Sequence, residues 1–231
     1  EYEEKILPVE LGKYLPDSDL PELNAVEIES VERFHRLYYY LAQRGYATNA
    51  LSWLGYQALK CPLDLWIYQE LIFKLRPDII LETGTASGGS AMFLACMCQL
   101  IGHGEVITID IDARSLDSLP KHSRLTYIFG SSTSYDVLVQ IESKLRPMQR
   151  AMVILDSDHR KDHVLAELRE YQRFVSVGSY LIVEDTNING HPAYPEFGEG
   201  PMEALNAFLG ETDAFTQDPK CERFLMTMNP R

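Results

Sequence analysis

The chain has 231 residues with 34 acidic and 21 basic side chains, so its formal net charge is −13 at pH 7. This length suits one large α/β domain or two small ones, and a sizeable core can be buried. Binding to nucleic acid and docking on anionic membranes both depend on clustered Lys and Arg, so the acidic balance argues against these partners. A cation, or a substrate recognised through its hydroxyl groups, is the more natural ligand.

The first 60 residues differ in pattern from the rest. Residues 1–24 contain three prolines, many acids and no lasting periodicity, so we expect an extended arm that packs on a partner subunit of a homo-oligomer. Apolar residues then recur at steps of three or four, which predicts a helix over residues 25–44. We therefore expect an N-terminal arm and helical extension over residues 1–60, followed by a catalytic domain over residues 61–231.

A helix is expected over residues 63–74, between two prolines. After Pro77, short apolar runs alternate with amphipathic stretches. The expected strands are residues 78–82, 106–110, 125–129, 152–156 and 180–185, and the helices between and after them are 89–100, 134–145, 162–175 and 201–209. The strands lack strict polar alternation, as is typical when helices cover both faces of a sheet. This order predicts an α/β fold, a doubly wound, Rossmann-like parallel sheet with every strand's carboxyl end at one edge.

The cysteines and the apolar runs indicate a cytoplasmic protein. Four cysteines without a regular spacing do not make a disulfide framework. The longest uncharged apolar stretch, residues 91–101, is too short to span a bilayer, so no membrane span is expected. No charged-then-apolar signal peptide opens the sequence.

A glycine-containing loop, ETGTASGGS at residues 82–90, joins the first strand to the next helix. Gly84 permits a sharp turn, and the later glycines let a ligand approach the helix N-terminus, which favours an anionic group. The spacing is not G-x-G-x-x-G, which disfavours a nicotinamide cofactor. Asp110 ends the second strand, where a carboxylate binds ribose hydroxyls. S-adenosylmethionine fits this combination. The expected cofactor-binding residues are Glu82, Gly84, Thr85, Gly88, Ser90, Asp110, Ser131 and Ser132, although the two serines also suit a plain turn.

Three carboxylates follow the fourth and fifth strands. Asp156, Glu184 and Asp185 are expected to face one another across neighbouring strands, where unpaired carboxylates repel. A hard divalent cation resolves this repulsion, and an all-oxygen site favours Mg²⁺ over Zn²⁺. Neutralisation by Arg160 or Lys161 is the alternative.

One histidine stands close to these carboxylates in the sequence. His159 follows Asp156 by three residues, a position suited to a general base that titrates near neutral pH. His163, one helical turn further on, is expected on the helix surface. The Gly/Pro-rich loop at residues 188–201 is expected to carry a substrate lid, unless it is a plain surface loop. Its candidate substrate residues are His191, Tyr194 and Phe197.

Several motifs together resemble the cephalosporin hydroxylase/rhamnosyl O-methyltransferase family, class I methyltransferases that use S-adenosylmethionine. They are ILETGTASGGS, VITIDID, VILDSDH and LIVEDTNINGHP, with GEGPMEAL further on, and the resemblance covers roughly residues 50–231. The sequence is more distantly similar to Mg²⁺-dependent catechol-type and macrolide-sugar O-methyltransferases. The resemblance implies Asp156, Glu184 and Asp185 as metal ligands and His159 as the base, where catechol-type relatives often have a lysine.

The expected activity is O-methylation of a small polyhydroxylated acceptor, a sugar or a catechol-like group, with S-adenosylmethionine and Mg²⁺. Two alternatives stay open: a reaction of the cephalosporin C7 hydroxylation/methoxylation type, and a non-catalytic subunit that binds the cofactor. A haloacid-dehalogenase-type phosphatase or a sugar-nucleotide glycosyltransferase also places D-x-D after an apolar strand. In the phosphatase pattern, however, that pair ends the first strand of the core, whereas here it ends the fourth.

Overall fold

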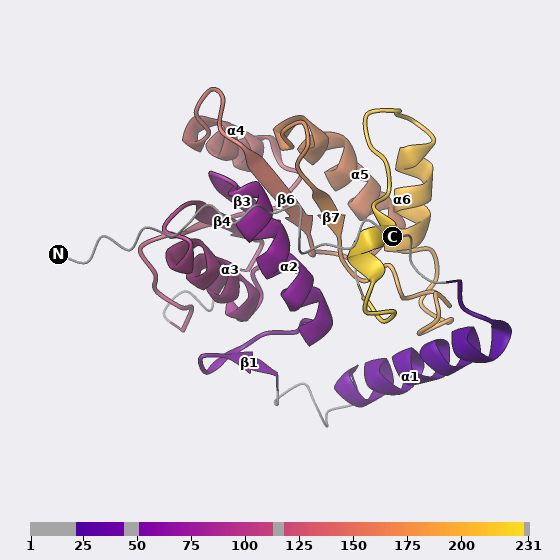
Figure 1. The fold of residues 1–231 in the computed structure, drawn as a ribbon. Helices are drawn as coiled ribbons and strands as arrows, with labels where there is room; N and C mark the ends of the chain where they lie inside the picture. Colours follow the sequence, from indigo (N-terminus) through magenta and orange to yellow (C-terminus); the bar gives the residue numbers. More distant parts are fainter. Residues whose placement is uncertain (1–21, 44–50, 113–117, 229–231) are drawn as a thin grey trace.

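The computed structural model describes residues 22–43, 51–112 and 118–228. Its centre is a sheet of five parallel strands in the order β5-β4-β3-β6-β7 (Figure 1). The strands are β3 (Ile79–Thr83), β4 (Glu105–Asp110), β5 (Leu125–Phe129), β6 (Ala151–Leu155) and β7 (Leu181–Val183). All five expected strands are present, and the predicted doubly wound α/β fold is confirmed.

Helices cover both faces of this sheet (Figure 1). Successive strand residues point to opposite faces, so Ile80 and Ile154 pack in one apolar cluster while Leu81 and Leu155 pack in the other. The first cluster lies under α2 (Pro62–Leu75) and α3 (Gly89–Leu100). The second lies under α4 (Tyr135–Lys144), α5 (Lys161–Tyr171) with the short η2 (Gln172–Phe174), and α6 (Pro201–Leu209). Burial on both faces explains why the strands show no polar alternation.

The strand register brings the polar strand ends to one edge. Thr83 of β3 pairs with Ile109 of β4 and with Leu155 of β6, and Leu155 pairs with Val183 of β7. The residues that follow these positions therefore meet at the same level. β6 and β7 are neighbours, which is the arrangement expected for the two strands that precede the acidic residues.

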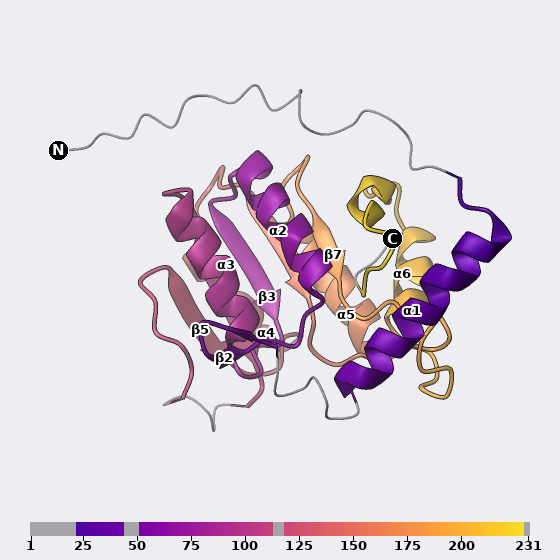
Figure 2. The same cartoon turned by 60° about the horizontal axis from the view of Figure 1, so that its bottom comes forward.

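Helix α1 (Ala25–Gln43) and a small strand pair lie against this body. Helix α1 runs beside the chain that follows β7 (Figure 2), where the buried Tyr39 packs with Ile188 and Ala193. Strands β1 (Ser52–Trp53) and β2 (Tyr56–Gln57) pair antiparallel, and Trp53 packs edge-on against Phe93 of α3. The β1–β2 pair was not predicted. The expected division into an N-terminal extension and a catalytic domain at residue 60 stays a prediction. The expected extended arm over residues 1–24 falls largely outside the described residues.

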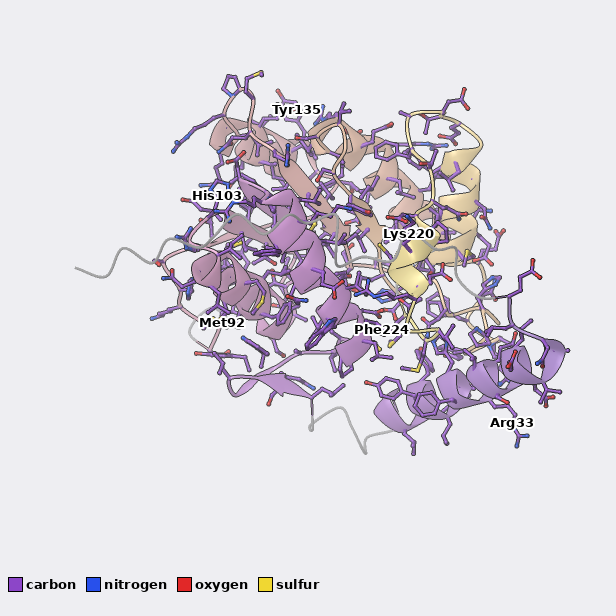
Figure 3. The ribbon with its side chains drawn as sticks, in the orientation of Figure 1. Arg33, Met92, His103, Tyr135, Lys220 and Phe224 are labelled. Atoms are coloured by element: carbon purple, nitrogen blue, oxygen red, sulfur yellow. The ribbon has the colours of Figure 1, made fainter. Side chains whose placement is uncertain are left out.

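The C-terminal segment contains the short helix η3 (Pro219–Glu222). Among residues 22–43, 51–112 and 118–228, no helix is long and apolar enough to cross a membrane. Arg33 extends from the outer side of α1 into solvent, which marks the side of that helix away from the sheet (Figure 3).

Candidate active site

Three of the predicted residues converge where β6 and β7 end. Asp156, His159 and Asp185 each offer one ligand atom, and these atoms lie within 4.8 Å of one another. His159 Nε2 contacts Asp185 Oδ2 and lies 3.8 Å from Asp156 Oδ1. The carboxylate oxygens of Asp156 and Asp185 at this spacing fit a hard divalent cation, and the imidazole lies close enough to exchange a proton beside it.

Glu184 lies next to this cluster, and its carboxylate accepts hydrogen bonds from two other side chains. The ammonium of Lys60 donates to Glu184 Oε1 at 2.5 Å and to Asp156 Oδ2 at 2.5 Å. The hydroxyl of Tyr68, on α2, donates to the same Oε1 of Glu184. Oδ2 of Asp156 therefore accepts a hydrogen bond from Lys60, while Oδ1 faces His159.

The basic residues that were expected as an alternative to a cation lie elsewhere. Arg160 binds Asp158 through its guanidinium, and this pairing holds the pKa of Asp158 at about 2. Lys161 donates to Glu199 Oε1 at 2.7 Å. Neutralisation by Arg160 or Lys161 was therefore wrong, because the lysine that reaches the carboxylates is Lys60. No motif in the sequence singled it out.

Burial and close charges oppose one another at this site. Burial raises the pKa of Asp156 and of Glu184, while Lys60 acts to lower both. Burial lowers the pKa of Lys60, but Asp156 and Glu184 raise it more, so the ammonium stays charged. Burial also lowers the pKa of His159, and its bond to Asp185 more than offsets this and raises that pKa to about 9.

The glycine loop turns directly above the neighbouring strand end. Gly84 has a φ of +87°, and a side chain there would collide with the carbonyl oxygen of Asp156, 1.8 Å from the added carbon. Only glycine allows this turn. Asp110 ends β4 beside the loop, where its carboxylate accepts from the backbone N–H of Ala86 and of Asp112, each at 2.8 Å. The loop and Asp110 are thus held together.

Several other residues that were predicted to bind the cofactor form hydrogen bonds or close contacts with other side chains of the chain. Glu82 is fully buried and accepts from Ser90 Oγ at 2.6 Å and from Thr108 Oγ1 at 2.7 Å. The Thr85 hydroxyl lies 2.7 Å from that of Thr108. At Gly88, the missing side chain leaves room for Pro120. This arrangement fixes the shape of the loop from beneath, whatever the loop binds.

His163 was expected on the helix surface, and its side chain is 26% exposed, but its ring nitrogen also lies in a polar network. Its Nε2 lies 3.2 Å from Ser132 Oγ, 3.1 Å from Ser157 Oγ and 3.5 Å from Glu167 Oε1. Glu167 is fully buried, and it raises the pKa of His163. Ser132 is tied in again because Tyr171 donates to its carbonyl oxygen. Ser131, its neighbour, has its hydroxyl 3.4 Å from that of Thr133.

Replacing His163 is therefore expected to weaken the fold. His163→Ala removes one contact from the buried Glu167 carboxylate and one from each of the Ser132 and Ser157 hydroxyls, while Ser157 still donates to Glu167 at 2.7 Å. The expected cost is about 1–3 kcal/mol in the free energy of unfolding. Chemical denaturation measures this cost. The matched control is His103→Ala: His103 pairs with Asp78 at the opposite edge of the sheet, is partly exposed (Figure 3), and is expected to cost less than about 0.5 kcal/mol. Equal stability of both variants would contradict the role of the network.

The predicted substrate residues lie on the loop that α1 covers. His191 Nε2 lies 2.8 Å from Glu203 Oε1, at the start of α6. The rings of Tyr194 and Phe197 pack with their centroids 5.6 Å apart, and Tyr194 also lies beside Tyr39 of α1. Burial raises the pKa of Tyr39 to about 12, with a further contribution from the charge of Asp185. Helix α1 therefore packs against the chain that follows Asp185, which sequence patterns did not indicate.

Comparison with known proteins places these features in a family. The profile described as "Rhamnosyl O-methyltransferase/CmcI" matches residues 44–231. A rhamnosyl O-methyltransferase of Mycobacterium leprae (strain TN) is 37% identical over 182 residues, which are 78% of this chain and 78% of that protein.

Solved structures share the fold. An apo structure of CmcI matches with a TM-score of 0.53 and 23% identity, covering 69% of this chain and 66% of CmcI, so this chain spans just under two thirds of the CmcI length. A structure of CmcI with Mg and SAM matches with a TM-score of 0.50 over the same shares. These findings confirm the resemblance that the motifs indicated. The chain belongs to the rhamnosyl O-methyltransferase/CmcI family and is a methyltransferase with the class I fold.

Proposed function

We propose that this protein transfers the methyl group of S-adenosylmethionine to a hydroxyl of a small polyhydroxylated acceptor, with a divalent cation held near Asp156, Glu184 and Asp185. The observation that carries the proposal is the convergence of Asp156, His159 and Asp185 within 4.8 Å. This cluster follows β6 and β7, and β6 pairs with β3, which leads into the glycine loop. Asp110 ends β4, on the other side of β3. The family supports a deoxysugar as the acceptor, and a catechol-like group shares the required pair of vicinal oxygens.

Each group has a distinct part in this reaction. The glycine loop and Asp110 bind the cofactor, and Asp110 takes the ribose hydroxyls. A bound Mg²⁺ would supply Lewis-acid chemistry, lowering the pKa of the acceptor hydroxyl and orienting it. His159 Nε2 accepts the hydroxyl proton, and the oxygen attacks the methyl carbon while the sulfur leaves. We propose that the acceptor contacts His191, Tyr194 and Phe197. That the protein is cytoplasmic and forms a homo-oligomer stays a prediction.

Cofactor binding tests the first part. Asp110→Ala is expected to weaken S-adenosylmethionine binding by about 1–3 kcal/mol, because charge-assisted hydrogen bonds to the ribose are lost. Isothermal titration calorimetry measures this with S-adenosylmethionine and S-adenosylhomocysteine. Tight NAD binding without S-adenosylmethionine binding would contradict the proposal. A non-catalytic subunit would bind the cofactor and show no turnover with any hydroxylated acceptor.

A further inference from the structure

A buried lysine occupies the centre of the acidic site. Lys60 precedes α2 by two residues, and its side chain is 3% exposed. Its ammonium lies 2.5 Å from a carboxylate oxygen at the end of β6 and 2.5 Å from another at the end of β7. One side chain from outside the sheet therefore joins the two strand ends that carry the proposed metal ligands.

The charges of this group determine what Lys60 contributes. Asp156, Glu184 and Asp185 bring three negative charges into a space that is largely closed to water. A buried charge without a partner strongly destabilises a fold, and removing one member of a buried pair is more damaging than removing both. Lys60 cancels one of these negative charges, so it reduces the attraction that the carboxylates exert on a divalent cation.

We infer that Lys60 is the resident counter-ion of the acidic site, which holds Asp156 and Glu184 in place without metal and limits how tightly a divalent cation binds beside them. The inference rests on the proposed function, since it assigns Lys60 a role toward the proposed cation. Lys60 is a positioning residue here: it contacts the proposed ligands, and Asp185 and His159 lie on the other side of Asp156.

The first test is stability without metal. In excess EDTA, Lys60→Met is expected to lower the melting temperature by about 5–10 °C, because the buried carboxylates of Asp156 and Glu184 lose the ammonium group that pairs with them. The double variant Lys60→Met/Glu184→Gln removes one charge of each sign and is expected to melt above Lys60→Met. A single variant that melts with wild type, or a double variant that melts below the single one, would overturn the counter-ion role.

The second test is cation affinity, measured with Mn²⁺ by electron paramagnetic resonance. Lys60→Met is expected to bind Mn²⁺ at least about fivefold more tightly than wild type, because a positive charge beside the cation is removed. Mn²⁺ is also expected to raise its melting temperature more than that of wild type. If the variant folds only with metal, it is purified with Mn²⁺ and its affinity is measured by chelator competition. Unchanged or weaker binding would overturn the inference.

Two controls separate this inference from the proposed function. Lys161→Met removes an ammonium that pairs with Glu199 and is expected to leave Mn²⁺ affinity unchanged. Asp185→Asn is expected to weaken Mn²⁺ binding to the wild-type chain. If it does not, the proposed metal site fails and the inference fails with it. If it does, and Lys60→Met binds Mn²⁺ no more tightly than wild type, only the role of Lys60 is wrong.

Discussion

Asp156→Asn is expected to lower kcat by about 10³-fold or more, because the cation that activates the acceptor loses a charged ligand. Asn keeps the shape of the side chain, so the loss reports the charge. Asp156 is the residue on which the cluster depends, with one oxygen facing Lys60 and the other facing His159. Steady-state assays with saturating S-adenosylmethionine and Mg²⁺ measure the effect. EDTA is expected to abolish wild-type activity, and added Mg²⁺ to restore it.

The matched control for Asp156 is two residues away. Asp158 is bound by Arg160 and is not among the three residues that form the cluster. Asp158→Asn is therefore expected to retain most of the activity. A larger loss in Asp158→Asn than in Asp156→Asn would mean that the residues after β6 are assigned to the wrong sides of the chain.

His159→Ala is expected to lower kcat by about 10²–10⁴-fold, the usual contribution of a general base. Its Nε2 lies in the cluster where an activated hydroxyl must give up its proton. Affinity for S-adenosylmethionine is expected to stay unchanged, since Asp110 and the glycine loop bind it. His103→Ala, at the far edge of the sheet, is the control with unchanged kcat. A His159→Ala variant that keeps more than about a tenth of wild-type kcat would show that metal activation alone suffices.

The same residue determines the expected pH dependence. A proton acceptor must be neutral, and Asp185 raises the pKa of His159 to about 9 although burial lowers it. A cation bound nearby lowers this pKa again, because it disfavours the imidazolium. We therefore expect kcat to rise with pH through the neutral range in the wild type, as the fraction of neutral imidazole grows. His159→Ala is expected to lose this rise.

Local patterns predicted most of the fold. The apolar runs at residues 125–129 and 152–156, and the helix at residues 201–209, lie within one residue of the observed elements. The polar strand ends also met as expected, because parallel strands place their carboxyl ends at one edge. These features depend on neighbours in the sequence, and periodicity reveals them directly.

Contacts between distant segments were not predictable in this way. Lys60 lies 96 residues from Asp156 and 124 from Glu184, and no strand-end pattern surrounds it. One signal was present: Lys60 stands alone as a basic residue between Arg44 and Lys74, in an apolar stretch that leads into a helix. The packing of Tyr39 against Ile188 and Ala193, and the contact of His163 with Ser132, likewise depend on tertiary contacts.

Methyl transfer by this protein is expected to depend on a cation at Asp156. The most direct measurement incubates the protein with methyl-labelled S-adenosylmethionine and a panel of rhamnosides and catechols, and follows label and S-adenosylhomocysteine by mass spectrometry. We expect label on an acceptor hydroxyl, with a matching amount of S-adenosylhomocysteine, when Mg²⁺ is present. We expect no labelled product in EDTA and none with Asp156→Asn. Transfer at the wild-type rate in a rigorously metal-free sample, or in Asp156→Asn, would contradict this expectation.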